Sequence, residues 1–331
     1  MNAKAQLEAR PVRPAREEQI RRALFRGDNL VLENPRYLRA VQTFLDELLA
    51  SDAGAGDLTV QALGLAAGRT SGRILAKEPG IVAGIAECCW LLTRGGLAVR
   101  QRKNDGEPVN ADEILLEIEG QRGELLSFER VALNLLQRMS GIATMTHRLQ
   151  ERVQVRSPKT FVVATRKTPW GLLDKRAVHL GGGGTHRLGL GDAILMKSNH
   201  LALLAAREEE AVGLAIERAW AAFRQAAAFI EIEVRSVEAA VAAAQAFRRL
   251  REDESPSCPC LLLLDNMTPE AVRRTLDALD SEHLREEVLV EVSGTITENN
   301  LEEYAACGAD ALSMGALTHS PRALDLNLRI L

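Results

Sequence analysis

The chain has 331 residues, of which 46% are hydrophobic and 26% are charged, proportions that are typical of a soluble globular protein. Its net charge of -4 creates no global positive field, so we expect no nucleic-acid or membrane partner, and anions must be bound by local groups of Lys and Arg. No apolar run approaches the ~20 residues of a membrane span, and the N-terminus lacks the apolar segment of a signal peptide, which together predict a cytoplasmic protein.

The cysteines show no disulfide or zinc pattern. There are five of them, an odd number, and Cys258 and Cys260 form a Cys-Pro-Cys rather than a CxxC pair. We therefore interpret them as reduced thiols.

The first part of the chain predicts an extension, a helix and a group of short strands. Residues 1–36 are charged and interrupted by prolines, which predicts a mobile segment followed by a short helix. Residues 37–50 have helical spacing of apolar positions, and short strands with Gly and Asn-Asp-Gly turns follow between 57 and 120. The run 125–153 predicts a helix that is long enough to connect two domains.

Beyond this helix, short apolar runs alternate with helical segments. Such alternation predicts a parallel sheet covered by helices, and it leaves open whether the sheet is open and doubly wound or closed as an α/β barrel. The expected strands are FVVAT (161–165), AILMK (193–197), FIEIEV (229–234), LLLLD (261–265), VLVEV (288–292) and DALSM (310–314).

Charged or small residues occur at or directly after the end of every expected strand. Active sites of α/β proteins form at the carboxyl ends of their strands, so these residues predict a common site. Several cations there indicate an anionic ligand, and two carboxylates beside a polyanion indicate a divalent cation, Mg²⁺. The cations are Arg166, Lys167, His186, Arg187 and Lys197, and the carboxylates are Glu233 and Asp265.

Two further features refine this expectation. In the strand IEIEV we interpret Glu231 as facing solvent and Glu233 as facing the site, because Glu233 lies nearer the carboxyl end. The loops Ser293-Gly294-Thr295 and Gly315-Ala316 follow the last two strands, where backbone N–H groups of small residues can bind a phosphate.

These segments resemble, in their order, the quinolinate phosphoribosyltransferases, a type II phosphoribosyltransferase family whose members are also called carboxylating nicotinate-nucleotide pyrophosphorylases. The resemblance covers about residues 37–331 and is most specific from Thr165 to His200. It is carried by TRKTPWGLL, GGGGTHRLGLGDAILMKSNH, IEIEV, LLLLDN, VEVSGTI and SMGALTHS, and upstream by GDLTVQAL, AKEPGIVAG and ERVALNLLQRMSGIAT.

The resemblance implies a fold, a reaction and an assembly. The fold is an N-terminal α/β sandwich over 37–142, rejoined by 318–331, and an open, incomplete α/β barrel over 143–317, with 1–36 as an extension of unassigned role. The reaction joins quinolinate to phosphoribosyl pyrophosphate (PRPP) with Mg²⁺, and yields nicotinate mononucleotide, pyrophosphate and CO₂ in NAD biosynthesis. The assembly is a head-to-tail homodimer, which could assemble further, in which Arg130 is donated to the partner's active site.

The same matching implies roles for individual residues. Quinolinate would be held by Arg130, Thr165, Arg166, His186, Arg187 and Lys197. PRPP would be held by Lys167, Lys197, Glu233, Asp265, Ser293, Gly294, Thr295, Gly315, Ala316 and His319. Lys167, Glu233 and Asp265 are the expected catalytic residues, and Glu233 and Asp265 are the expected metal ligands.

The segment LGGGGTHRLGL (180–190) fits neither a P-loop nor a dinucleotide-binding loop, because it lacks their endings and spacing. A flexible linker is the other interpretation. We expect the glycines to adopt backbone angles that other residues avoid, so that His186 and Arg187 face the two carboxylates of quinolinate.

Three departures from the family pattern bear on the site. Arg166 and Arg187 are closer in sequence than expected, Thr295 replaces a glycine of an SGG motif, and a longer connection containing REDESPSCPC separates Glu233 from Asp265. We expect this connection to be a surface loop far from the site.

Three alternatives remain open. A molybdenum-transport-associated paralogue shares the HRLGL motif, but the KSNH segment (197–200) favours the NAD enzyme. A phosphoribosyltransferase that uses nicotinate would need fewer cations. A non-catalytic phosphometabolite-binding protein would have no need of Glu233 and Asp265.

Overall fold

The computed structural model describes residues 14–205, 207–252 and 258–331. These residues form two compact units. The parallel-sheet unit contains the described residues of 14–24, 157–160 and 189–313, and the antiparallel-sheet unit contains 25–156, 161–188 and 314–331. The predicted domain boundary near residue 142 does not coincide with this division and stays a prediction.

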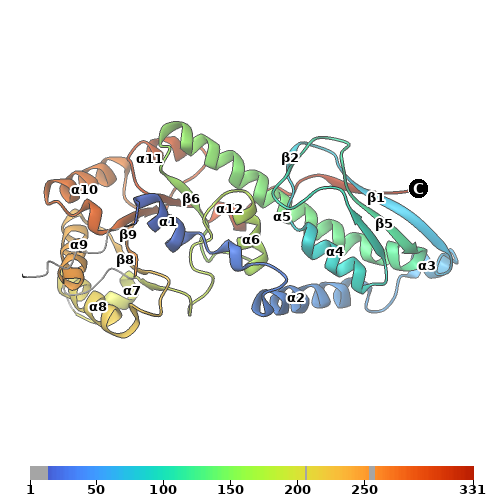
Figure 1. Ribbon diagram of the computed structural model, residues 1–331, viewed down its shortest axis with the longest axis horizontal. Coiled ribbons are helices and arrows are strands. Elements are labelled where there is room, and N and C mark those ends of the chain that lie inside the picture. Colours follow the sequence, from blue (N-terminus) through green and yellow to red (C-terminus); the bar gives the residue numbers. More distant parts are fainter. Residues whose placement is uncertain (1–13, 206, 253–257) are drawn as a thin grey trace, which may run out of the picture. The chain divides into compact units, whose positions relative to one another are not determined.

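The parallel-sheet unit alternates strands with helices, as expected. Its strands β7 to β11 have the order β11-β10-β9-β8-β7, and every pairing between them is parallel. Helices α8, α9 and α10 lie along the outside of β8 and β9 (Figure 1). The elements are α1 (Arg16–Leu24), β7 (Ile194–Met196), α7 (Ser198–Leu201), α8 (Glu208–Phe223), β8 (Ile230–Val234), α9 (Val237–Glu252), β9 (Cys260–Asp265), α10 (Pro269–Ser281), η2 (Arg285–Glu287), β10 (Leu289–Ser293), α11 (Leu301–Ala305) and β11 (Ala311–Ser313).

Burial explains why these strands can be located from the sequence. All five residues of β8 are buried, as are all of β9 except its last, Asp265. Strands of a parallel sheet are covered on both faces, so β9 reads as a continuous apolar run, whereas β8 alternates apolar residues with the buried Glu231 and Glu233. The following helix α10 begins at a proline after the N-cap Thr268, whose hydroxyl accepts from the Ala271 N–H, a favourable start for a helix.

The antiparallel-sheet unit contains a four-stranded sheet and a long helix. The sheet has the order β12-β1-β5-β3 with antiparallel pairing throughout, and α4 and α5 lie beside it (Figure 1). Its elements are η1 (Gly27–Asn29), α2 (Pro35–Ala53), α3 (Leu58–Ala62), β1 (Arg69–Ala76), β2 (Gly80–Ile81), α4 (Ile85–Arg94), β3 (Ala98–Gln101), β4 (Pro108–Val109), β5 (Ile114–Gln121), α5 (Arg122–Arg156), β6 (Phe161–Val163), α6 (Leu172–Leu180), α12 (Ala316–His319) and β12 (Leu326–Ile330).

The C-terminal strand closes this unit. β12 pairs with β1 from Gly72↔Ile330 to Ala76↔Leu326, so the end of the chain forms one sheet with its first half. Helix α5 buries Leu125, Leu136 and Met139 with other residues at helical spacing. The predicted long helix at 125–153 is therefore confirmed, with its ends extended to 122 and 156.

The segment before residue 25 is partly built into the parallel-sheet unit. The Arg16 guanidinium donates to both carboxylate oxygens of Asp310, at 2.6 and 2.7 Å, and to the carbonyls of Arg285 and Val288. These contacts fix the start of α1. The mobile segment that is predicted to precede this helix lies mostly in residues 1–13, outside the described residues.

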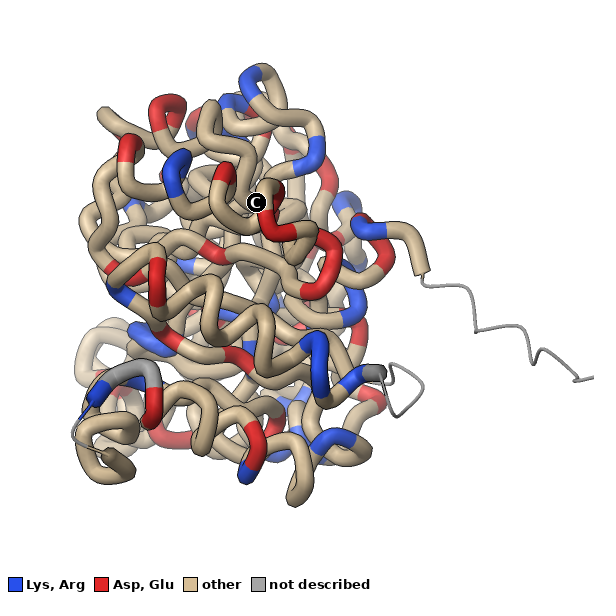
Figure 2. Tube along the Cα trace, turned by 90° about the vertical axis from the view of Figure 1, so that its left-hand side faces the viewer, with Lys and Arg blue, Asp and Glu red and all other residues tan. Residues whose placement is uncertain are grey.

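The charged residues of both signs are mixed along the chain. Lys and Arg are interspersed with Asp and Glu along the trace (Figure 2). Cys88, Cys258 and Cys260 are buried free thiols, and the middle of the REDESPSCPC connection, 253–257, lies outside the described residues. None of the helices in the described ranges is both long and apolar enough to cross a membrane.

Candidate active site

The parallel-sheet unit presents its expected site residues at the carboxyl ends of its strands. Glu233 is the fourth residue of β8, and Asp265 is the last residue of β9. Asp265 is in register with Ser293, the last residue of β10, and Lys197 directly follows β7. Four strands thus end in residues that are predicted to act together.

Glu233 and Asp265 converge on one cationic atom. A single guanidinium nitrogen of Arg235, Nη2, lies 3.5 Å from Glu233 Oε1 and 3.2 Å from Asp265 Oδ2. Glu233 also accepts the Ser198 N–H at 3.2 Å, and Asp265 accepts the Asn266 amide at 2.9 Å. The acid pair, as we call Glu233 and Asp265, therefore supplies carboxylate oxygens that face a common point.

This donor set suits Mg²⁺. Magnesium prefers oxygen ligands and is commonly held by one or two carboxylates together with substrate phosphates. The position of Arg235 Nη2 shows that both carboxylates can address the same positive charge. The acid pair could hold the metal and leave its remaining positions to water and a phosphorylated substrate.

The loop after β10 lies against the residue after β9. Gly294 has a φ of +94°, and a Cβ placed on it would lie 2.2 Å from the side-chain oxygen of Asn266. The Asn266 N–H donates to the Ser293 carbonyl at 3.0 Å, and Asn266 itself has a φ of +56°. The expected phosphate loop is thus a tight turn that only glycine can form at 294, with Thr295 exposed beside it.

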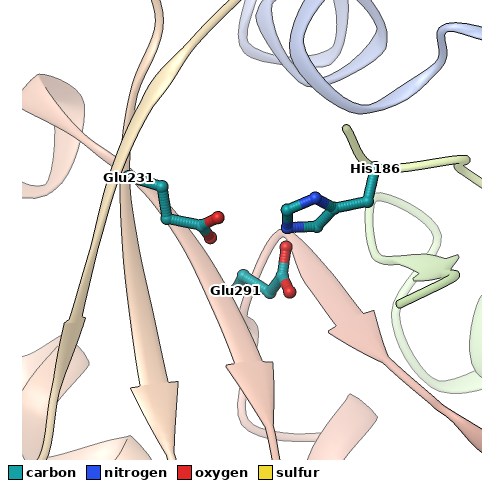
Figure 3. A group of neighbouring side chains, drawn as sticks. All are labelled: His186, Glu231 and Glu291. Carbon is teal, nitrogen blue, oxygen red and sulfur yellow. The ribbon is translucent and has the colours of Figure 1, made fainter. Parts of the chain in front are cut away.

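The interpretation of Glu231 as a solvent-facing residue is wrong. Glu231 is completely buried, and Glu291 of β10 is buried as well. Figure 3 shows both carboxylates projecting from their strands into the same space. Because side chains two residues apart on a strand share a face, Glu231 must point to the same side as Glu233.

In the antiparallel-sheet unit, the loop after β6 and the glycine-rich segment lie side by side. Val163 forms a parallel bridge with Gly184, and the Ala164 N–H donates to the Gly184 carbonyl at 2.8 Å. This pairing places residues 165–167 next to residues 185–187. Arg166 and Lys167 are exposed, and Thr165 accepts the Lys167 N–H at 3.1 Å.

His186 and Arg187 are buried and held in an unusual backbone conformation. His186 has a φ of +54°, uncommon for a residue with a side chain, and its ring Nδ1 accepts the Arg187 N–H at 2.7 Å. The Thr185 carbonyl accepts from Lys175 Nζ at 2.6 Å, and Lys175 is only 2% exposed. A buried lysine on α6 therefore fixes the backbone directly before the two site residues.

The glycines of this segment act differently from one another. Only Gly182 among them has a positive φ, at +87°. At Gly181 and Gly183 there is no room for a side chain. A Cβ on Gly181 would lie 2.4 Å from the Ala143 carbonyl oxygen, and a Cβ on Gly183 would lie 2.6 Å from the Thr146 side chain. The expectation of unusual backbone angles is right for Gly182 and wrong for its two buried neighbours.

The segment before and within α12 meets the loop after β6. The Thr318 hydroxyl donates to the Lys167 carbonyl at 2.7 Å. A Cβ on Gly315 would lie 3.0 Å from the ring of His319 and 3.1 Å from the side chain of Lys167. Lys167 and His319 thus converge over Gly315, with Ala316 at the start of α12, and Arg130 is exposed separately on α5.

A buried polar network supports α6. Arg176 lies 2.7 Å from the Glu87 carboxylate and 3.1 Å from Asp105, and the Tyr37 hydroxyl donates to Glu87 at 2.8 Å. Burial raises the pKa of the Glu87 carboxyl, and the nearby Arg176 guanidinium opposes that shift. The network ties α6 to α2 and α4, and so steadies the helix that carries Lys175.

The segment before α6, which lies between Arg166 and Arg187, is also anchored by packing. The Trp170 ring contacts Phe44 at 4.8 Å between centroids, and the Arg138 guanidinium lies 5.0 Å from the Trp170 ring. Arg138 forms two hydrogen bonds with the buried Asp174 carboxylate, at 2.9 and 3.0 Å. These residues, like Lys175 and Arg235, are not identified by the sequence patterns.

Comparison with known families identifies the class of protein. Two family descriptions match the chain, the quinolinate phosphoribosyl transferase N-terminal domain over residues 57–140 and its C-terminal domain over residues 142–329. The chain therefore belongs to the quinolinate phosphoribosyl transferase family, as its motifs indicate.

Individual relatives cover most of the chain. A protein from Archaeoglobus fulgidus, named a probable carboxylating nicotinate-nucleotide pyrophosphorylase, is 38% identical over 260 residues, which are 78% of this chain and 93% of the relative. The carboxylating nicotinate-nucleotide pyrophosphorylase of Mycobacterium leprae is 38% identical over 281 residues, which are 82% of this chain and 90% of the relative.

Solved structures share the fold. NadC from Streptococcus pyogenes has a TM-score of 0.74 at 31% identity and covers 88% of this chain and 97% of its own. The nicotinate-nucleotide pyrophosphorylase of Francisella tularensis has a TM-score of 0.74 at 28% identity and covers 88% and 96%. The predicted α/β fold class is confirmed, whereas the roles of the individual site residues stay predictions.

Proposed function

We propose that this protein transfers the phosphoribosyl group of PRPP to quinolinate, with release of pyrophosphate and CO₂, and thereby forms nicotinate mononucleotide for NAD biosynthesis. The observation that carries the proposal is family membership over most of the chain, combined with carboxylates of suitable chemistry at the strand ends of the parallel-sheet unit.

Quinolinate recognition would rest on Arg166, His186 and Arg187. Quinolinate carries two adjacent carboxylates on a planar ring, and a guanidinium can bind a carboxylate through two parallel hydrogen bonds. Arg187 is suited to this role because it is buried, and a charge-assisted hydrogen bond is stronger away from water. The exposed Arg130 would complete the pocket of a partner subunit in a homodimer.

PRPP would be held by its phosphates and its ribose. Lys167 and His319 converge over Gly315 and could bind a phosphate group, and the turn at Gly294 lets backbone N–H groups approach another. Lys197 and the acid pair would address the pyrophosphate and the ribose hydroxyls.

The chemistry needs positioned charge rather than a general base. The lone pair of the quinolinate ring nitrogen attacks the ribose C1 while the bond from C1 to the pyrophosphate oxygen breaks, and the acid pair stabilises the positive charge that develops on the ribose. When bound, Mg²⁺ would neutralise negative charge on the leaving pyrophosphate. The carboxylate next to the ring nitrogen then leaves as CO₂, its bonding electrons stay on the ring carbon beside the pyridinium nitrogen, and that carbon takes a proton from water.

One assay tests the reaction. The purified protein is incubated with PRPP, Mg²⁺ and either quinolinate or nicotinate, and mononucleotide and CO₂ are both measured. We expect nicotinate mononucleotide and CO₂ in equal amounts from quinolinate alone. Product from nicotinate only would identify the non-decarboxylating reaction, and no product from either would contradict an enzymatic role.

A pair of variants tests the assignment of the quinolinate site. Arg187→Ala is expected to lower kcat/KM for quinolinate about a hundredfold or more, because a bidentate charged contact of ~3 kcal/mol is lost. Arg39→Ala removes an exposed arginine on α2 and should leave the kinetics unchanged. Equal kinetics of the wild type and Arg187→Ala would reject the assignment.

We further propose a cytoplasmic location and a homodimeric assembly. The five free thiols are consistent with the cytoplasmic location expected from the sequence. A homodimer with Arg130 donated across its interface is testable by mixing two inactive variants, Arg130→Ala and Arg187→Ala. If each site takes Arg130 from its partner, mixed dimers regain one intact site, whereas no recovery after subunit exchange would reject the shared site.

A further inference from the structure

Arg235 is a cation placed at the acid pair by the chain itself. It directly follows β8, and its Nη2 contacts both Glu233 and Asp265. The two carboxylates are largely buried, whereas the Arg235 side chain is 56% exposed. The contacts are 3.5 and 3.2 Å long, so the arginine neutralises the acid pair without a short bidentate bond.

A metal ion and Arg235 would compete for the same oxygens. Magnesium is commonly held by carboxylate oxygens, and Glu233 Oε1 and Asp265 Oδ2, which would hold it here, are the atoms that contact Nη2. Two cations at that point repel one another. The guanidinium therefore has to withdraw when a metal binds to both carboxylates.

The surroundings allow this withdrawal. Arg235 lines a cavity of about 600 Å³, together with Asp265, Asn266, Thr268 and Arg274. Exposed ion pairs contribute only ~0.2–1 kcal/mol each, so the two contacts of Arg235 can be exchanged at small cost. The side chain has both the room and the weak attachment that a replaceable counter-ion needs.

We propose that Arg235 is an internal counter-ion that occupies the divalent-cation position of the acid pair in the substrate-free enzyme and is displaced when Mg²⁺ enters with PRPP. The inference rests on the proposed function, because it assigns the acid pair to Mg²⁺ and PRPP. Its consequence is that the free protein binds divalent cations weakly, and that the metal is bound well only when substrate phosphates add ligands. Arg235 is thus a positioning residue that couples metal binding to substrate binding.

The test measures metal binding directly. The full-length protein without substrate is titrated with Mn²⁺, and free Mn²⁺ is followed by electron paramagnetic resonance. Arg235→Gln is expected to lower the Kd for Mn²⁺ about two- to thirtyfold, the range given by the loss of two such ion pairs. Arg235→Lys, which keeps the charge, should lie between this variant and the wild type.

Two controls locate the effect. Arg274→Gln removes an equal charge from the same cavity, at a residue for which the described structure gives no ion pair with the acid pair, and should change the Kd by less than about twofold because exposed charges are screened. The double variant Arg235→Gln/Glu233→Gln should lose the gained affinity. Thermal unfolding that matches the wild type shows that each variant is folded.

The outcomes separate this inference from the proposed function. Three results would overturn the proposal that Arg235 is a counter-ion. They are equal Mn²⁺ affinity of the wild type and Arg235→Gln, a gain of the same size in Arg274→Gln, and no Mn²⁺ binding by any variant. Product formation from quinolinate and PRPP by the wild type is measured separately. If the wild type forms product but Arg235→Gln binds Mn²⁺ no more tightly, only the role of Arg235 is rejected. If Arg235→Gln binds Mn²⁺ more tightly but the wild type forms no product, the proposed reaction is rejected.

Discussion

Lys175 offers the sharpest test of how the fold positions the proposed quinolinate site. Its ammonium group is buried on α6 and donates to the Thr185 carbonyl at 2.6 Å, one residue before His186. His186 has a φ of +54°, and a residue in such a conformation persists only where surrounding contacts hold it. Substitution of Lys175 by Met keeps a long unbranched side chain but removes the donor.

The expected magnitudes follow from this geometry. A hydrogen bond from a charged donor contributes ~1.5–3 kcal/mol, and part of that loss is recovered because a buried ammonium no longer has to be desolvated. We expect the free energy of unfolding to fall by ~1–2 kcal/mol. We expect kcat/KM for quinolinate to fall about ten- to a hundredfold, because small displacements of positioning groups cost this much in rate.

The assay combines urea unfolding with steady-state kinetics for each substrate. KM for PRPP should stay within about threefold of the wild-type value, because Lys175 acts on residues assigned to quinolinate. Lys159→Met, at an exposed lysine, serves as the control and should change stability by less than ~0.5 kcal/mol. Loss of stability in Lys175→Met with unchanged quinolinate kinetics would refute the reasoning, because the lysine would then support the fold only.

Three further predictions concern other parts of the chain. Asp174→Asn weakens the buried pair with Arg138, so the free energy of unfolding should fall by ~2–4 kcal/mol in urea; a change below ~0.5 kcal/mol would show that the pair is dispensable. Burial raises the pKa of the Cys260 thiol to about 12, so iodoacetamide at pH 8 should modify this residue only after unfolding, and rapid modification of the native protein, read by peptide mass, would contradict its burial. Gly315→Ala places a methyl group 3.1 Å from the Lys167 side chain, so KM for PRPP should rise about tenfold with little change in stability; an unchanged KM would place the phosphate elsewhere.

The strands and their carboxyl ends are predictable because their signals are local. A parallel strand buried on both faces is a continuous apolar run, and the residue that follows it lies at one edge of the sheet. The run LLLLD predicts a strand at 261–265, and β9 occupies Cys260–Asp265. The same rule predicts that Glu233 and Asp265 lie at a common edge, where both contact Arg235.

The interpretation of Glu231 as solvent-facing conflicts with the alternation of side chains along a strand. Glu231 and Glu233 are two residues apart on β8, so the pleat places both on the same face. Assigning one to solvent and the other to the site treats the strand as half-exposed, although its neighbours β7 and β9 pair with it on both sides. A strand inside a parallel sheet with buried apolar residues at 230 and 232 implies two buried acids.

The supporting residues cannot be predicted, because their partners are distant in the chain. Arg176 meets Glu87 and Asp105 only through the tertiary fold, because these residues lie far apart in the chain, and no sequence spacing encodes their meeting. Arg235 differs, since it directly follows β8 and its position in the sequence is a usable signal. A cation after a strand is expected to bind the ligand, whereas Arg235 contacts the two carboxylates of the acid pair.

The two kinds of support have opposite consequences for engineering the site. Lys175 holds the backbone directly before His186 and Arg187. Its removal should therefore lower activity toward quinolinate, although Lys175 itself is not expected to contact the substrate. Arg235 neutralises the acid pair from the solvent side, so its removal should strengthen metal binding while leaving the fold intact. A buried charge that donates to a backbone carbonyl is hard to replace, whereas an exposed charge that contacts carboxylates at more than 3 Å is exchangeable. From this contrast we expect Lys175 to fix the geometry of the proposed quinolinate site and Arg235 to be displaced when metal and substrate bind.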